Sequence, residues 1–360
     1  MKKIIFAGLI SLLTCLSLKP RGPLHFIDPN IPVIYTKWQW NFPEEKMYFP
    51  SVDNENYKFS NGTITEFPLF KTFDMEDVKN NYLPEENIPY RNDKKSFIQG
   101  KKFEKMLKNF FKEILQKKDT YSDFTILKDD DWNRKKQAGL LVVRCKKHPF
   151  VIKLFMETPK SFMHPFNKGI IPLFQFGIGG GATRHLVGFT RIKNSNTIMK
   201  LLLESPEWKD YAEVPRKWYW LPQYPWIHIT TKNLGEPNEI KTITIPGAYM
   251  IIADFIDTGR TFKLSSKTDR TKILNLCNYL QCRVDPHINN FLVEKGTNKL
   301  VLIDTEHFPT LTGLQKPIDL RSYTQFYLHL SGKYAHETVF CLKNHRQSRR
   351  VSGYQPFCTP

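Results

Sequence analysis

The stretch CRVDPHINNFLVEKGTNKLVLIDTEHF, residues 282 to 308, carries the pattern from which the fold is predicted. Its first part holds three polar residues at offsets of zero, two and five, which are Asp285, His287 and Asn290. An apolar run, a turn with glycine and asparagine, and a second apolar run then lead to Asp304. Glycine and asparagine between two apolar runs are typical of a β-hairpin. The stretch therefore predicts a polar loop, a hairpin and a second carboxylate.

This layout suits phosphoryl transfer from ATP. That chemistry needs a carboxylate to orient the acceptor hydroxyl and take its proton, oxygen ligands for Mg²⁺, and a cation on the nucleotide phosphates. The groups must converge from neighbouring segments, and a loop followed by a hairpin can bring them together. Asp285 is the candidate base, and Asn290 and Asp304 are the candidate metal ligands. The alternative is a set of ordinary turn residues followed by an unrelated hairpin.

The same stretch resembles the catalytic and metal-binding loops of the protein-kinase-like fold, closest to its aminoglycoside phosphotransferase and choline kinase branch. That branch carries Asp-x-His-x-x-Asn, which Asp285, His287 and Asn290 match, and Ile-Asp-Phe-Glu, where this chain has IDTE from Ile303. The resemblance implies an α/β (α+β) two-lobed fold that binds ATP and Mg²⁺. It also implies that His287 helps position the acceptor or the phosphoryl group.

Two upstream segments extend the resemblance. The run FVIKLF, residues 150–155, is similar to the strand with the phosphate-binding lysine and nominates Lys153, although a plain surface lysine is the alternative. The run IIADFID is similar to the linker between the lobes. There, the backbone groups of three residues would meet the adenine, namely Asp254, Phe255 and Ile256. The resemblance covers residues 120 to 330, and its specific motifs lie near the opening stretch.

Some positions depart from the family pattern. Arg283 stands where the family has histidine, and DDDWNRKKQAG, residues 129–139, replaces a glycine-rich loop. A glutamate partner for Lys153 is not identifiable, because Glu157 is too near along the chain and Glu204 lies beyond an inserted segment. These departures leave a catalytically inactive, nucleotide-binding pseudokinase as the alternative function.

Hydrophobic periodicity predicts the main elements. GKKFEKMLKNFFKEILQKKD, residues 100–119, has an apolar stripe at helical spacing and is a packing helix, or alternatively a basic face for an acidic membrane. Further helices are predicted within 195–205 and from about residue 265 into the opening stretch. Strands are predicted at the following ranges: 124–127, 139–145, 150–155 and 248–256.

These elements suggest a division of the chain. The predicted parts are a signal peptide or membrane anchor at 1–19, an irregular surface extension at 20–98, an N-lobe at 99–256 and a C-lobe at 257–360. The N-lobe would carry a large insertion at 159–245, and the reduced C-lobe would end in a basic tail.

Three other features are assigned structural roles. FGIGGGATRH, residues 176–185, lacks the Gly-Lys-Ser/Thr of a phosphate loop and is interpreted as a flexible turn. The tryptophans of residues 208–226 are interpreted as packing residues, with stacking of a sugar or base as the alternative. Cys277 and Cys282 are predicted to be core residues on one helix, and the absence of a CxxC pair disfavours a zinc site.

The formal charge of +18 favours anionic partners: a phosphorylated small molecule, an acidic membrane surface or, on charge alone, nucleic acid. The motifs favour a nucleotide together with a hydroxylated small-molecule or glycolipid acceptor, and they do not favour nucleic acid. The N-terminal run MKKIIFAGLISLLTCLSLKPRG has two lysines, an apolar run and flanking cations, which is the pattern of a secretory signal. We therefore expect export or membrane attachment, with an uncleaved anchor or a buried strand as the alternatives.

Overall fold

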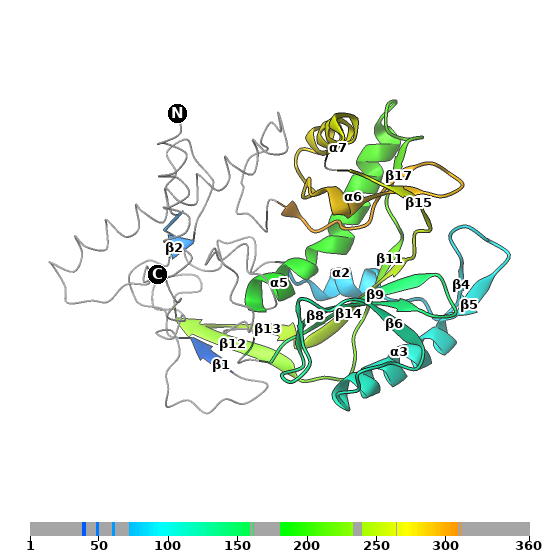
Figure 1. Cartoon of the computed structure of the whole chain (residues 1–360). Coiled ribbons are helices and arrows are strands. Elements are labelled where there is room, and N and C mark those ends of the chain that lie inside the picture. Colours follow the sequence, from blue (N-terminus) through cyan, green and yellow to red (C-terminus); the bar gives the residue numbers. More distant parts are fainter. Residues whose placement is uncertain are drawn as a thin grey trace, which may run out of the picture.

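The computed structural model describes residues 72–158, 181–232, 240–263 and 265–308, together with 161, 310 and three short strands. These strands are β1 (Trp38–Trp40), β2 (Tyr48–Phe49) and β3 (Ser60–Asn61). The described part is a mixed α+β structure with several largely antiparallel sheets and helices on both faces of the largest one (Figure 1). The expectation of an α+β fold is thus confirmed at this level.

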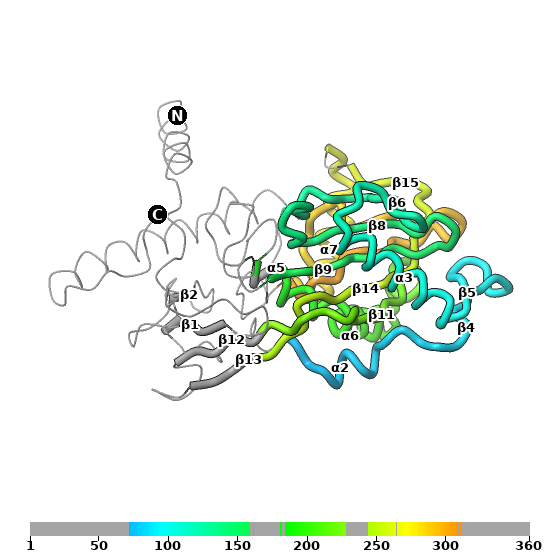
Figure 2. Tube along the Cα trace, turned by 90° about the horizontal axis from the view of Figure 1, so that it is seen from below, coloured from blue at the N-terminus to red at the C-terminus, as the bar shows by residue number. Residues whose placement is uncertain are grey.

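The largest sheet has the order β11–β14–β9–β8–β6, and the short β7 pairs with β8. All of its neighbouring strands are antiparallel. Figure 2 shows the five strands of this path side by side. The bounds are β6 Phe124–Lys128, β7 Trp132–Asn133, β8 Ala138–Cys145, β9 Phe150–Met156, β11 Lys217–Trp220 and β14 Ala248–Asp254. The strands predicted at 124–127, 139–145, 150–155 and 248–256 are therefore present.

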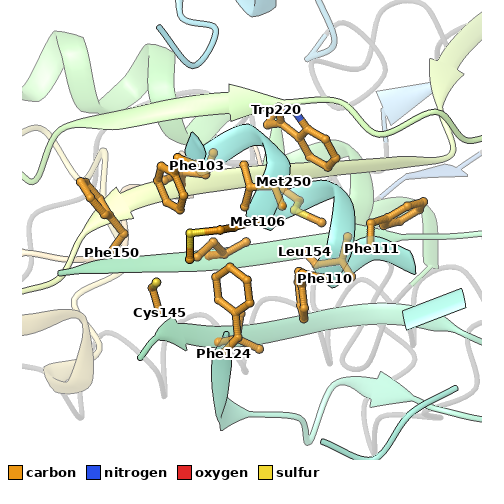
Figure 3. Close-up of a cluster of buried hydrophobic side chains, with 14 of the residues drawn as sticks. Phe103, Met106, Phe110, Phe111, Phe124, Cys145, Phe150, Leu154, Trp220 and Met250 are labelled. Carbon is orange, nitrogen blue, oxygen red and sulfur yellow. The ribbon is translucent and has the colours of Figure 1, made fainter. Parts of the chain in front are cut away.

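One face of this sheet is covered by helix α3 (Gly100–Leu115). Apolar side chains of α3 interdigitate with alternate residues of the strands, including Phe103, Phe110, Phe150, Leu154 and Met250 (Figure 3). Alternation occurs because successive side chains of a strand point to opposite faces. The predicted packing helix is confirmed, except that Leu115, at the end of the stripe, is 44% exposed.

The opposite face of the sheet meets three helices: α2 (Met75–Asn80), α5 (Gly181–Gly188) and α6 (Thr190–Glu204). Its core contains the stacked rings of Phe155, Tyr249 and Phe189. A Cβ at Gly188 would lie 1.9 Å from the hydroxyl of Tyr249, so glycine permits this close approach of α5 to the sheet. Because Lys153 is two residues before Phe155 on β9, it shares this face.

A second hydrophobic core lies on the far side of α6. It joins α6 to α7 (Lys267–Tyr279), the 3₁₀ turn η5 (Ile288–Asn290) and a four-stranded sheet of order β10–β17–β16–β15. The strands are β10 Ala212–Glu213, β15 Thr258–Thr261, β16 Phe291–Glu294 and β17 Leu300–Leu302. The predicted hairpin is confirmed as β16–β17, and its turn has positive φ at Gly296 and Asn298. Figure 1 shows α6 running from α5 up to α7 and these strands.

The remaining strands form smaller sheets. β12 (Trp226–Lys232) pairs with β13 (Ile240–Pro246) and, in parallel, with β1. β2 pairs with β3, and β4 (Asn87–Pro89) pairs with β5 (Phe97–Gln99).

Three sequence interpretations need correction. Residues 72–98 are not only a surface wrapping, because α2 forms there and Ile88 and Ile98 are buried beneath α3. Residues 181–185 of the glycine-rich run belong to helix α5 rather than to a flexible turn. Cys277 and Cys282 are both buried, as predicted, but α7 ends at Tyr279, so they do not share a helix.

The four tryptophans have packing positions. Trp208 and Trp220 are buried in the two cores, Trp218 packs at the edge of one, and Trp226 meets Phe73 edge to face. The predicted N-terminal signal, residues 176–180 and the basic tail lie outside the described residues. Within the described part, no helix is long and apolar enough to cross a membrane.

Candidate functional site

The candidate site is centred on Asp304, directly after β17. The ammonium of Lys153, on β9 of the large sheet, lies 3.0 Å from Oδ2 of Asp304. Both side chains are partly exposed, at 20% for Lys153 and 23% for Asp304. Two residues that the sequence nominated from separate motifs are therefore in direct contact between the large sheet and the hairpin.

A second cation on Asp304 comes from helix α6. Nε of Arg191 donates to Oδ1 of Asp304 at 2.9 Å, and Nη2 lies 3.5 Å from Oδ2. The same Nη2 is 3.1 Å from Oε1 of Glu306, and the guanidinium lies over the ring of Phe155. The Arg191 side chain is only 1% exposed. Arginine is effectively always protonated in proteins, so a permanent buried charge faces Asp304.

Lys217, at the start of β11, is a third cation at this site. Its ammonium donates to the hydroxyl of Thr305, which donates in turn to the backbone carbonyl of Arg191 at 2.7 Å. Arg184 of α5 lies more loosely, 3.7 Å from Glu306. The site thus combines four cationic side chains with the carboxylates of Asp304 and Glu306.

The pKa shifts follow from burial and from these charges. Burial alone would raise the pKa of Asp304, but Arg191 and Lys153 outweigh it and hold that pKa well below its usual value. Burial lowers the pKa of Lys153, and Asp304 partly opposes this effect. Burial also lowers the pKa of Lys217 well below its usual value, and the charge of Lys153 adds to the shift. Asp304 is therefore ionised, and an anion beside the two lysines would favour their charged forms.

The predicted polar loop, which holds Asp285, His287 and Asn290, is hydrogen-bonded to the segment that precedes Asp304. Nδ2 of Asn290 donates to the backbone carbonyl of Asp285 at 3.2 Å, and Oδ1 of Asp285 accepts from the His287 N–H at 3.0 Å. The carbonyl of Asn290 accepts from the N–H of Ile303 at 3.0 Å, one residue before Asp304. The backbone of Asn290 therefore lies beside the residue that precedes Asp304. The side chain of His287 is exposed.

Helix α6 holds the two loops together. Nδ2 of Asn194 donates to the carbonyls of Arg283 and Thr305, each at 3.0 Å. The N–H of Phe308 also donates to the carbonyl of Arg283 at 3.1 Å. Two loops separated by a hairpin are thus fastened to each other and to the helix that carries Arg191.

The predicted adenine linker has partners of its own. The side chain of Asp254 is buried and receives two hydrogen bonds from the guanidinium of Arg216, at 2.9 and 2.7 Å. The N–H of Asp254 donates to the carbonyl of Arg216, and that of Phe255 donates to the carbonyl of Pro149. Within the described residues, the N–H of Ile256 has no such partner. Contact with an adenine would therefore rest on Ile256 and on carbonyl groups of the linker.

Glu157 is not a partner of Lys153. It is 1% exposed, and its carboxylate accepts from the N–H of Gly181 at 2.6 Å, at the first residue of α5. A carboxylate at a helix N-terminus satisfies a donor that the helix itself cannot satisfy. Glu157, directly after β9, thus connects this strand to α5, and Lys153 and Glu157 have different partners.

The ionisation of Glu157 gives a testable pH dependence. Burial raises its pKa from 4.5 to about 7, so the folded protein holds this proton more tightly than the unfolded chain does. The stability that it contributes therefore falls as the pH rises from 4.5 through 7. Relative to wild type, Glu157→Gln should gain about 2–3 kcal/mol of unfolding free energy between pH 5 and pH 8.

The measurement is chemical denaturation of both proteins at several pH values. Burial also lowers the pKa of His185 and of His307 to about 4, but these contributions are common to both proteins and cancel in the difference. A difference that does not change with pH would contradict the burial of an ionisable Glu157.

The described residues do not fit a divalent metal in this arrangement. Both oxygens of Asp304 face cations, and no group of three histidine, cysteine, aspartate or glutamate side chains in the described part could hold a metal ion. A metal at Asp304 would compete with the guanidinium of Arg191 at Oδ1 and with the ammonium of Lys153 at Oδ2. The carbonyl of Asn290 is bonded to the N–H of Ile303, next to Asp304, and ligation of Mg²⁺ by Asn290 and Asp304 stays a prediction.

Two cavities lie away from this site. One, of about 530 Å³, lies between the turn at residues 207–211 and the first turns of α7. The other, of about 480 Å³, lies among α6, β10 and the loop after β4, with basic side chains such as Lys94 and Lys209. Neither is lined by Lys153, Asp285 or Asp304, so size alone does not identify the candidate site.

Sequence reasoning did not find Arg191, Lys217 or Asn194. Arg191 and Lys217 lie 38 and 64 residues after Lys153, in segments without a motif. The only signal was cationic residues at the start of a helix and of a strand, which are common on protein surfaces. The chain matches no protein-family model, and no curated protein matches its sequence.

Proposed function

We propose that this chain binds ATP between the large sheet and the β16–β17 hairpin and transfers its terminal phosphoryl group to a hydroxyl. The observation that carries the proposal is the 3.0 Å contact between Lys153 and Asp304. The resemblance assigns these residues to the phosphates and to the hairpin end of a kinase-like site. A lysine that merely happens to lie on a strand would not be expected to contact an aspartate 151 residues later in the sequence.

The proposed fold is two-lobed and kinase-like. It is supported by a lysine on the third long strand of an antiparallel sheet and by a helix, polar loop and hairpin in that order after the linker at 254–256. In this proposal the N-lobe spans 99–256, with the insertion 159–245, and the C-lobe begins at 257. Part of that insertion belongs to the lobe itself, because β11 pairs with β14 in the large sheet.

The proposed roles follow from the positions. Lys153, with one contact to Asp304, has ammonium donors left for phosphate oxygens. Asp285, held by Asn290 at the end of η5, would orient the acceptor hydroxyl and take its proton. His287, exposed beside it, would position the acceptor or the phosphoryl group. The acceptor classes proposed are a small molecule, a glycolipid or a protein.

A second candidate function is favoured by Arg191. Its buried contact with Asp304 occupies the carboxylate on which a metal-dependent kinase relies. A catalytically inactive, kinase-like interaction protein that keeps nucleotide binding is therefore the alternative. Export or attachment through the N-terminal run, and contact with an acidic membrane surface, remain proposals for either function.

Nucleotide binding is tested by thermal unfolding. Millimolar ATP in a MgCl₂ buffer should raise the melting temperature of the wild type, because a ligand that binds only the folded state stabilises it. Lys153→Met should weaken ATP binding about 10- to 100-fold, since a hydrogen bond to a charged group contributes about 1.5–3 kcal/mol. Lys147→Met, in the exposed turn after β8, is the matched control and should behave as the wild type.

The outcomes separate the possibilities. An unchanged melting temperature of the wild type at millimolar ATP would rule out both candidate functions. Binding that Lys153→Met leaves intact would move the nucleotide away from this site. If ATP binds, its consumption with sugar, choline and protein acceptors distinguishes the enzyme from the inactive protein.

A further inference from the structure

The contact between Arg191 and Asp304 bears on how a nucleotide would be held here. In metal-dependent phosphoryl transfer, divalent ions next to the carboxylate supply the positive charge that faces the phosphates. In this chain the guanidinium of Arg191 lies on both oxygens of that carboxylate, with Nε at 2.9 Å. A cation of the protein thus already contacts the carboxylate that would ligate the metal.

The Arg191 guanidinium is firmly held. The guanidinium contacts Asp304 and Glu306 and lies over the ring of Phe155. The backbone carbonyl of Arg191 also accepts a hydrogen bond from the hydroxyl of Thr305. Its Nη1 is buried and has no hydrogen-bond partner among the described residues. A metal ion on Asp304 would compete with Arg191 at Oδ1 and with Lys153 at Oδ2, and a displaced guanidinium would stay buried with Glu306 but without Asp304.

The charges of the site point to an anion rather than to a metal. Lys153, Lys217, Arg184 and Arg191 outnumber Asp304 and Glu306 by two charges when all are ionised. A divalent cation would increase this excess, whereas phosphate oxygens would neutralise it. Lys153 and Lys217 both project from the same face of the sheet, on β9 and β11. Among the described residues, the ammonium of Lys153 contacts Asp304 and that of Lys217 contacts Thr305. Each ammonium has further N–H donors for an anion.

We propose that this site binds the phosphates of a nucleotide without a divalent metal. Arg191 neutralises Asp304 in the metal's place, and Lys153 and Lys217 contact the phosphates. This inference rests on the proposed nucleotide binding and alters its cofactor requirement.

The first test needs no variant. ATP is titrated into the full chain by calorimetry, once with excess EDTA and once with MgCl₂. The dissociation constants should agree within about threefold. Binding at least tenfold weaker in EDTA would overturn the inference and leave the proposed function standing. Absence of binding in both buffers would overturn the inference and the proposed function together.

Two variants test the assigned roles in EDTA. Lys217→Gln should weaken ATP binding at least tenfold, and Lys209→Gln, an exposed lysine outside the site, should not change it. Unchanged binding by Lys217→Gln would overturn the role given to that lysine in phosphate binding.

Asp304→Asn separates the two modes of binding most sharply. Removing a carboxylate from an electropositive site should leave ATP affinity in EDTA equal to or higher than that of the wild type, whereas removing a metal ligand should weaken binding in MgCl₂. Circular dichroism and a thermal melt confirm the folding of each variant. Loss of ATP binding by a folded Asp304→Asn protein would overturn the inference.

Discussion

Asp285→Asn is expected to lower the rate of phosphoryl transfer by about 10²- to 10⁴-fold, the range that a positioned general base contributes. The substitution keeps the side-chain oxygen that accepts from the His287 N–H at 3.0 Å. It also leaves the Asp285 carbonyl, which accepts from Asn290, unchanged. The loop should therefore fold as in the wild type, and ATP affinity should stay within about threefold.

The measurement is the rate of product formation with an acceptor on which the wild type consumes ATP. Asp210→Asn, an exposed aspartate in the turn before β10, is the matched control and should keep the wild-type rate. Equal rates for wild type and Asp285→Asn would exclude Asp285 as the base. A wild type that binds ATP but consumes none with any acceptor would favour the inactive, kinase-like protein.

Arg191→Met should remove about 3–5 kcal/mol of unfolding free energy, the range observed when one partner of a buried ion pair is lost. The Arg191 side chain is 1% exposed, and its removal leaves Asp304 and Glu306 without their shared cation. Lys153 still contacts Asp304, but among the described residues Glu306 keeps only the cation of Arg184, at 3.7 Å. Methionine fills much of the space beside Phe155, so the expected loss comes mainly from the charges.

Chemical denaturation at neutral pH measures this loss as a change in unfolding free energy. Arg184→Met is the matched control, because Arg184 is 21% exposed and its ion pair is long. That control should cost less than about 1 kcal/mol, as partly exposed ion pairs do. A loss below 1 kcal/mol for Arg191→Met would mean that the ion pair of Arg191 with Asp304 and Glu306 contributes little to the unfolding free energy.

Much of the local structure follows from residue patterns. The apolar stripe from Phe103 to Ile114 predicted α3, since residues three and four apart share one helix face. Short apolar runs predicted β8 and β9, and the glycine and asparagine of the turn predicted the β16–β17 hairpin.

Helix α5 shows where local patterns were insufficient. Three successive glycines before Ala182 indicated a turn, because glycine disfavours helix. The helix forms because Glu157 accepts from its first N–H and because Leu186 and Val187 are buried beneath it. Both stabilising contacts come from outside the segment, so its own sequence underestimates it.

The sequence alone determined which residues form the polar loop and the hairpin, because both depend on neighbours within a few positions. It also nominated Lys153 and Asp304. Only the tertiary structure decided that these two side chains are 3.0 Å apart and that Arg191 shares the carboxylate with Lys153. The physical reason is that Arg191 reaches the site because α6 packs on the large sheet, and Lys217 because β11 pairs with β14 in that sheet. Such contacts between distant segments leave no local pattern in the sequence.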